Sequence, residues 1–185
     1  MSMPEFATFL DLTRFQLTLN ESVVIKSASA QSVNKTVFLA YSSKDSEYRA
    51  GVISVLESSG GRVYIDKADA TLPRKPNRKT AEVLRSSIRS CRRFVIFFST
   101  NSKDSVQIPW ELGLADGEKG HALIALFPTA SNSTDQNWAS QEYLGLYQVV
   151  VWGIIDGVLT QPDWIVLNRQ SSTAVTLNSW LAQSI

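Results

Sequence analysis

The sequence predicts an open α/β fold of the flavodoxin-like type, in which a five-stranded parallel sheet carries helices on both faces. Two observations predict it. Five short apolar segments of strand length alternate along the chain with segments whose apolar residues recur at helical spacing. One of these segments, residues 94–98, is apolar throughout, which is typical of a central parallel strand covered on both faces. Because crossovers between parallel strands are right-handed, the alternation favours a sheet between two helical layers.

Each element is placed by its own pattern. The expected strands are short apolar segments and comprise residues 37–41, 63–65, 94–98, 122–127 and 147–152. The expected helices lie between and after them, around residues 48–56, 81–91, 109–117 and 174–181. Gly60 and Gly61 end the first of these helices, since glycine readily adopts the backbone conformation common at helix C-termini.

Residues 1–34 differ in pattern from the main domain, which we expect to comprise residues 35–185. The segment is expected to begin with an amphipathic helix capped by Ser2, and the alternation at residues 15–19 indicates a short strand. Residues 27–34 are small and polar, as in a linker. We interpret the segment as an appendage whose aromatic side chains dock on its own domain or on a second copy.

Composition excludes several classes of function. The chain has 185 residues, with 18 Lys and Arg against 17 Asp and Glu, and its net charge of +1 lacks the field of a dedicated nucleic-acid-binding protein. One cysteine, Cys91, and one histidine, His121, exclude a disulfide framework and any metal site that needs several such ligands. No apolar run approaches the ~20 residues that span a bilayer, and the N-terminus carries no secretory signal. We therefore expect a cytoplasmic protein that uses neither a membrane nor a metal.

Several familiar motifs are also absent. The sequence has no G-x-G-x-x-G turn for a dinucleotide and no G-x-x-x-x-G-K-[ST] loop for phosphoryl transfer. The third strand ends in Ser99 and Thr100, without the aspartate that phosphate-accepting receiver domains need. His121 stands at the start of the fourth strand, away from the expected site, which argues against a Ser-His-Asp relay. Cys91 is interpreted as a core residue on the apolar face of its helix.

Ligands of open parallel sheets bind beyond the carboxyl ends of the strands, which here lead into residues 41–45, 66–79 and 99–111. Glu111 is the residue that we single out there, because it lies in the first turn of the third helix beside Trp110, whose bulk can shield its carboxylate. The alternative is a surface glutamate that complements the helix dipole, an effect of about 0.3–1 kcal/mol. Nearby, Asp45 is expected to cap the first helix of the main domain.

Three linked motifs resemble those of a TIR (Toll/interleukin-1 receptor) domain and occur in the same order. Residues 37–45 (VFLAYSSKD) are similar to its first strand and S-x-x-D-type loop, and residues 64–66 to its second strand with an acidic end. Residues 69–79 stand in the place of its long BB loop. Residues 97–102 and 110–115 resemble the strand, serine-rich loop and glutamate-bearing helix of the NAD-cleaving members.

The resemblance covers about residues 35–185 and implies that the protein cleaves NAD+ at the bond between nicotinamide and ribose, with Glu111 as the catalytic residue. NAD+ is then the substrate, and no cofactor is implied. The product is ADP-ribose or a cyclic ADP-ribose isomer. Many members carry an aromatic residue four positions before the glutamate, where this chain has Gln107. A free-standing protein of this type most resembles bacterial antiphage signalling enzymes of the Thoeris type, whose nucleotide product is sensed by a downstream effector.

The residues expected to bind the substrate lie at the same strand ends and are Tyr41, Ser42, Ser43, Asp66, Arg74, Lys75, Ser99 and Trp110. For several of them a purely structural role stays open. The first three can serve as a strand end and helix cap, and Asp66 can order the loop that follows it. The two basic residues can simply be solvated, and Trp110 can be a core anchor.

Two other functions stay open. Many TIR domains are scaffolds that only assemble with one another through the BB loop, although Glu111 beside a serine-rich loop favours an enzyme. A nucleoside deoxyribosyltransferase-like enzyme has a similar fold and also places a glutamate at an N-glycosidic bond. Catalytic TIR domains commonly complete their site across a contact between copies, so the resemblance also implies self-association through TIR–TIR contacts.

Overall fold

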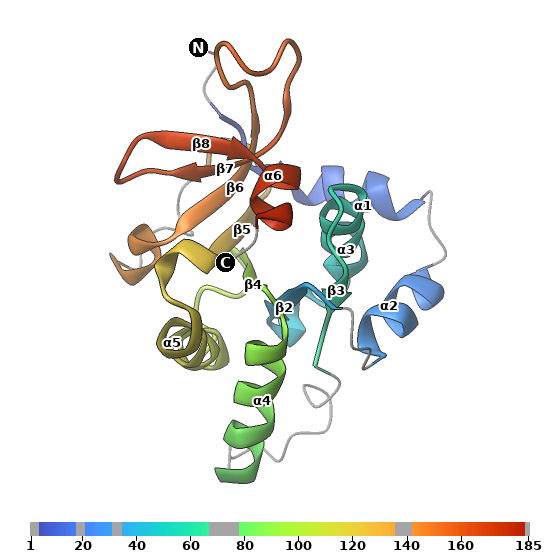
Figure 1. Ribbon diagram of the computed structural model, residues 1–185. Helices are drawn as coiled ribbons and strands as arrows, with labels where there is room; N and C mark the ends of the chain where they lie inside the picture. Colours follow the sequence, from blue (N-terminus) through green and yellow to red (C-terminus); the bar gives the residue numbers. More distant parts are fainter. Residues whose placement is uncertain (1–3, 18–20, 31–34, 67–77, 136–141, 184–185) are drawn as a thin grey trace.

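The computed structural model describes residues 4–17, 21–30, 35–66, 78–135 and 142–183, and its strands form one sheet (Figure 1). The order across the sheet is β3-β2-β4-β5-β6-β7-β8, and β1 pairs with β5. The strands are β1 (Ala7–Thr8), β2 (Val37–Tyr41), β3 (Val63–Tyr64), β4 (Arg93–Ser99), β5 (Ile124–Ala130), β6 (Gln148–Gly153), β7 (Asp163–Asn168) and β8 (Thr173–Thr176).

The predicted α/β fold with a parallel central sheet is confirmed. β3, β2, β4, β5 and β6 correspond to the five expected strands, and each pairs in parallel with its neighbour. β4 lies between β2 and β5, and all seven of its residues are buried, as expected for a strand covered on both faces. The carboxyl ends of these five strands therefore face the same edge of the sheet.

The sheet has more strands than the sequence predicted. β7 runs antiparallel to β6, with Val150 opposite Val166, and β8 runs antiparallel to β7. A strand that returns antiparallel needs no crossover helix, so the alternation of strands and helices gives no sign of it. The short β1 pairs in parallel with the last residues of β5.

Helices cover both faces of the sheet, as predicted. α1 (Phe9–Leu17), α2 (Glu21–Ser29), α3 (Arg49–Ser58) and α6 (Leu177–Ala182) pack on one face, and α4 (Arg78–Ser90) and α5 (Gln107–Lys119) on the other. Successive residues of β2 alternate between the two cores: Val37, Leu39 and Tyr41 face the first group of helices, and Phe38 and Ala40 the second. In Figure 1, α1, α2 and α3 lie together on the right, and α4 and α5 at the lower left.

The N-terminal segment folds differently from the prediction. Residues 15–17, expected in a strand, belong to α1, and residues 27–29, expected in a linker, belong to α2. The Thr8 hydroxyl accepts a hydrogen bond from the Asp11 backbone, and the Asp11 carboxylate accepts one from the Thr8 backbone, so that a capping box starts α1. The expected cap Ser2 lies outside the described residues. The boundary at residues 34 and 35 stays a prediction.

This segment packs on the main domain. Leu12 of α1 is fully buried, and Glu5 exchanges two backbone hydrogen bonds with Trp152 of β6, at 2.8 and 2.7 Å. α1 and α3 approach so closely that a Cβ atom at Gly51 would lie 2.6 Å from the backbone oxygen of Leu12. Gly51 is therefore required by the contact between the two helices.

A buried arginine forms hydrogen bonds between the central strand, β4, and the last described helix, α6. Arg93 of β4 is only 2% exposed, and its guanidinium donates hydrogen bonds to the backbone oxygens of Trp180 and Gln183, at 2.8 and 3.0 Å. The same guanidinium lies 4.9 Å from the centre of the Trp180 ring, within the range of a cation–π interaction. Two of the three guanidinium nitrogens are thus bonded to the end of α6.

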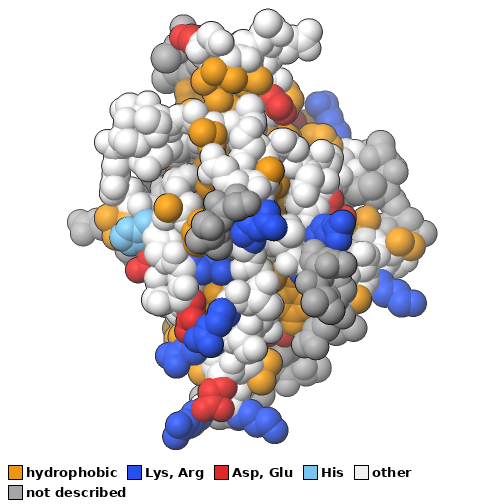
Figure 2. Space-filling view, in the orientation of Figure 1, with side chains coloured by type: hydrophobic (Ala, Val, Ile, Leu, Met, Phe, Trp, Pro, Cys, Tyr) orange, Lys and Arg blue, Asp and Glu red, His pale blue; other side chains and the backbone are white. Residues whose placement is uncertain are grey.

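Charges of both signs are interspersed on the face shown in Figure 2. The exposed first turn of α4 is an example, since Arg78 and Glu82 form an ion pair there at 3.0 Å. Among the helices of the described residues, none has the length and apolar character needed to cross a membrane.

Gly51→Ala is expected to destabilise the protein by about 1–3 kcal/mol, because the added methyl group collides with backbone that cannot rotate away. Gly113→Ala is the matched control, since a Cβ atom there meets nothing within 4 Å. The control is expected to be neutral or to stabilise α5 by up to about 1 kcal/mol. Thermal unfolding of both variants measures the difference, and equal melting temperatures would contradict the close packing of α1 on α3.

Candidate active site at the carboxyl edge of the sheet

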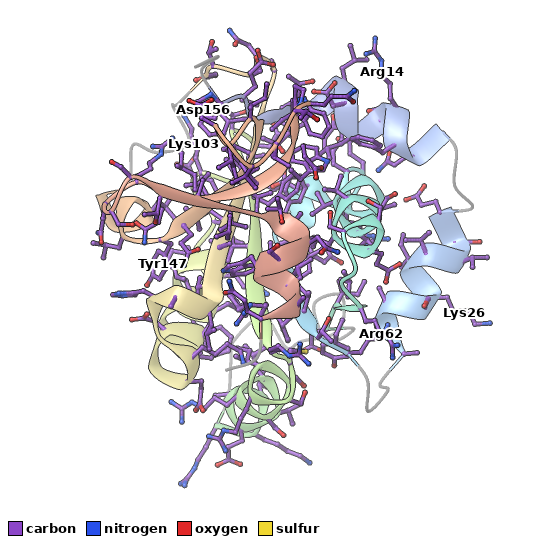
Figure 3. All side chains as sticks on the ribbon, turned by 45° about the horizontal axis from the view of Figure 1, so that its top comes forward. Arg14, Lys26, Arg62, Lys103, Tyr147 and Asp156 are labelled. Carbon is purple, nitrogen blue, oxygen red and sulfur yellow. The ribbon has the colours of Figure 1, made fainter. Side chains whose placement is uncertain are left out.

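The loops that follow β2 and β4 lie at the carboxyl edge of the sheet. In Figure 3, Lys103 in the loop after β4 and Asp156 after β6 lie near each other at the upper left. Tyr147, which precedes β6, lies below them at mid-height, and Arg62, which precedes β3, lies lower on the right. His121 precedes β5, and its Nε2 pairs with the Asp116 carboxylate at 3.2 Å. The histidine is thus at the amino edge, as predicted from the sequence.

A buried polar cluster joins the loops after β2 and β4. The Ser99 hydroxyl donates a hydrogen bond of 2.5 Å to Oδ1 of Asp45, and the backbone of Ser99 donates one of 3.0 Å to the Ser102 hydroxyl. All three residues are fully buried. The backbone N–H of Asn101 donates to the Ser99 hydroxyl, which closes the turn after β4. The path of this turn is therefore set by side chains of two separate loops.

The expected helix cap at Asp45 is wrong. Asp45 lies in the 3₁₀ helix η1 (Ser43–Asp45), and it is the Ser42 hydroxyl that caps this helix by accepting a hydrogen bond from Lys44 N. The Asp45 side chain turns inward to Ser99 instead. Burial raises the pKa of this carboxyl above its ordinary value, although hydrogen bonds with Ser102 and Ser99 act in the opposite direction.

Glu111 projects from the first turns of α5 and is only 5% exposed. The alternative of a surface glutamate is therefore wrong. The side-chain amide of Gln107, one turn earlier, donates a hydrogen bond of 2.7 Å to Oε1 of Glu111. Ile108, Leu112 and Ala115 hold this helix on the core, so that Glu111 comes to lie at the end of α5 that follows the Ser99 turn.

This arrangement can stabilise a positive charge. A carboxylate shielded from water interacts more strongly with a nearby cation than an exposed one does, because the local dielectric constant is low. Breaking an N-glycosidic bond produces such a cation on the sugar. Among the described residues, no group of three or more His, Cys, Asp or Glu side chains is placed to hold a metal ion.

The other predicted site residues differ in their surroundings. Tyr41 is buried, and its hydroxyl accepts a hydrogen bond of 3.2 Å from Arg49. Ser42 is buried as the cap of η1, whereas Ser43 is exposed. Asp66 is partly buried just after β3.

The remaining predicted site residues are Trp110, Arg74, Lys75 and Ser99. Trp110 is partly buried and packs against the core beneath α4 and α5, in agreement with the core-anchor alternative. Arg74 and Lys75 lie outside the described residues. Ser99 is fully buried, and its hydroxyl is bonded to Asp45 and to the backbone of the turn after β4.

Sequence reasoning missed Ser102 and Gln107 as parts of the site. Ser102 stands three residues after a buried strand end, a spacing that suits a side chain folding back on the strand's last backbone N–H. Gln107 stands four residues before Glu111, the spacing at which side chains on one helix face meet. Both spacings can be read from the sequence alone and could have identified these two residues.

Residues 37–149 match the sequence model of a family described as the TIR domain. Over 150 residues, the chain is 35% identical to a curated protein of Bacillus cereus (strain MSX-D12) named "Probable 3' cyclic ADP-D-ribose synthase ThsB'". This similarity covers 80% of the chain and 76% of that protein. The family match begins with β2 and ends within β6, so that it spans the parallel part of the sheet and includes Glu111.

Asp45→Asn keeps an oxygen that can accept from Ser99 and removes the charge. Because the folded pKa of Asp45 is raised above the ordinary 3.8, the native state holds a proton that the unfolded chain has released, and native stability falls as pH rises from about 4. The variant lacks this loss, so its stability relative to the native protein is expected to rise over that interval. Urea unfolding between about pH 4 and 7 measures it, and parallel curves would show that Asp45 does not titrate in this way.

Proposed function

Because the chain belongs to the TIR domain family, we propose that it is an enzyme that cleaves NAD+ between nicotinamide and ribose and releases a cyclic ADP-ribose isomer. The observation that carries the proposal is the buried Glu111 carboxylate, hydrogen-bonded by Gln107 at the carboxyl edge of the sheet. The similarity to a protein named as a 3' cyclic ADP-D-ribose synthase supports the same reaction and favours the 3' isomer as product.

The reaction requires one carboxylate close to the ribose. When the bond between the ribose carbon and the nicotinamide nitrogen breaks, both electrons leave with nicotinamide, which becomes neutral, and a positive charge develops on the ribose. Glu111 stabilises that charge and accepts hydrogen bonds from the ribose hydroxyls. No acid has to protonate the leaving group, because its nitrogen is already quaternary. This chemistry suits a chain with a single histidine and a single cysteine.

The fate of the ribosyl cation decides the product. Capture by water, with loss of a proton, gives ADP-ribose, and capture by a hydroxyl or an adenine nitrogen of the same molecule gives a cyclic isomer. Exclusion of water from the site therefore favours cyclisation. The burial of the Glu111 side chain, which is only 5% exposed, is consistent with such exclusion.

The remaining substrate contacts are assigned by position. The exposed Ser43 and the partly buried Asp66 follow neighbouring strands, β2 and β3, and can contact the ribose or adenine. Arg74 and Lys75 are proposed to face the diphosphate. The four other predicted residues are at least partly buried, and we propose that they support the walls of the substrate pocket without contacting the substrate directly. They are Tyr41, Ser42, Ser99 and Trp110.

We further propose that the product is an antiphage signal read by a separate effector, and that copies of the chain associate to complete the site. Glu111 of one copy would then be covered by the BB loop of the next. NAD+ binds as the substrate, without a cofactor.

Glu111→Gln is expected to lower NAD+ cleavage at least about 100-fold, because the substitution keeps the size of the side chain and removes the charge that stabilises the cation. Glu118→Gln is the matched control, since Glu118 lies in the last turns of the same helix, paired with Arg89 at 2.8 Å. Mass spectrometry of the products measures nicotinamide and the nucleotide. The control is expected to retain native activity.

The outcome of this assay also separates the alternatives. Release of no nicotinamide by the concentrated native protein would contradict the enzyme and support a scaffold. Cleavage of deoxynucleosides but not of NAD+ would support a nucleoside deoxyribosyltransferase-like reaction. Linear ADP-ribose as the sole product would contradict cyclisation.

The specific activity of the native chain is expected to rise with protein concentration, because association completes the site. Initial rates over a dilution series, compared with the molecular mass by light scattering, measure this dependence. A dilute monomer that turns over at the full rate would show that one copy is sufficient.

A further inference from the structure

We propose that Gln107 is a positioning residue for Glu111: its side-chain amide fixes the carboxylate in the orientation that stabilises the ribosyl cation. The inference rests on the proposed function, which supplies the cation. It concerns a residue that differs from the aromatic one many TIR domains carry at this position. The hydrogen bond between the two side chains, 2.7 Å from Nε2 to Oε1, is the observation that carries it.

The geometry follows from the helix. Gln107 is the first residue of α5 and Glu111 lies one turn later, so that the two side chains share one face. Gln107 is half-buried and Glu111 is 5% exposed. A hydrogen bond to a charged group is stronger than one between neutral groups, and in a shielded site it is stronger still. The amide therefore restrains a side chain that has several rotatable bonds of its own.

The amide has an advantage over a basic side chain. Lysine or arginine at position 107 would also donate a hydrogen bond, but its positive charge would offset the negative charge that the sugar cation needs. The glutamine amide donates without a net charge, and it does not titrate. Gln107 thus holds the carboxylate without adding a charge of its own.

The chain that leads into α5 is bonded to the buried cluster described above, two residues before Gln107. Ser105 N donates a hydrogen bond of 2.8 Å to the backbone oxygen of Ser102, and Ser102 bonds to the Ser99 turn. The residue that precedes α5, Val106, provides no side-chain cap. The start of the helix is therefore fixed from the Ser99 side, and the Gln107 side chain points along the helix to Glu111.

The test replaces the amide by a group of similar size that cannot donate. Gln107→Met is expected to lower kcat for NAD+ cleavage roughly 10- to 100-fold, the range for losing a hydrogen bond to a charged group. KM is expected to change less than about threefold, because the lost interaction matters most when the cation forms. Gln107→Lys is expected to lower kcat too, although it keeps a donor.

Gln148→Met is the matched control. Gln148 at the start of β6 donates its amide to the backbone oxygen of Ala122 at 3.1 Å, far from the carboxyl edge. The control is expected to keep the native kcat and KM. A native kcat in Gln107→Met, or a loss expressed in KM alone, would overturn the inference. The melting temperatures of all variants show whether a loss of activity follows from unfolding.

A second measurement does not depend on catalysis. In a proton–nitrogen correlation spectrum, the Gln107 amide signals are identified by their absence in Gln107→Met. The proton bonded to the carboxylate is expected downfield, and Glu111→Ala, which removes its acceptor, is expected to shift this signal upfield. An amide signal that does not respond to Glu111→Ala would overturn the inference. If the native protein releases no nicotinamide although this signal responds, the proposed function fails and the contact between the two side chains stands.

Discussion

The hydrogen bond between the Ser99 hydroxyl and Asp45 joins two loops that are 54 residues apart in the chain. β2 and β4 are neighbours in the sheet, so their carboxyl ends are brought together by the strand order alone. The direction in which the chain leaves β4 is set by Asp45, Ser99 and Ser102, all fully buried. The start of α5, and with it Glu111, depends on that direction. A buried polar cluster whose members bond to one another specifies one path more sharply than apolar packing does.

Glu111 is held by two kinds of constraint. The apolar residues of α5 decide that the helix lies on the core and that its fourth and fifth residues, Trp110 and Glu111, are shielded from water. The amide of Gln107 then donates a hydrogen bond to one oxygen of the carboxylate. A buried carboxylate is costly unless it is hydrogen-bonded, and the Gln107 amide supplies one such bond without adding a charge.

The parallel sheet could be predicted because each strand is a short apolar run, and β4 in particular is buried along its whole length. β7 could not, since Trp164 to Leu167 belong to a return strand that no helix precedes. The alternation at residues 15–17 wrongly predicted a strand, because the capping box of Thr8 and Asp11 starts a helix that includes these residues. Glu111 and its edge of the sheet were placed from the sequence, whereas the partner of Asp45 was not. A contact between residues 54 positions apart leaves no local pattern.

The buried guanidinium of Arg93 makes the central strand depend on the last described helix. The carbonyl groups of Trp180 and Gln183 at the end of α6 accept its hydrogen bonds, and without α6 the start of β4 would carry a buried charge that lacks these acceptors. Burying a charge without partners is costly. Truncating the chain before α6 therefore removes two hydrogen bonds of the central strand as well as the apolar contacts of a short helix.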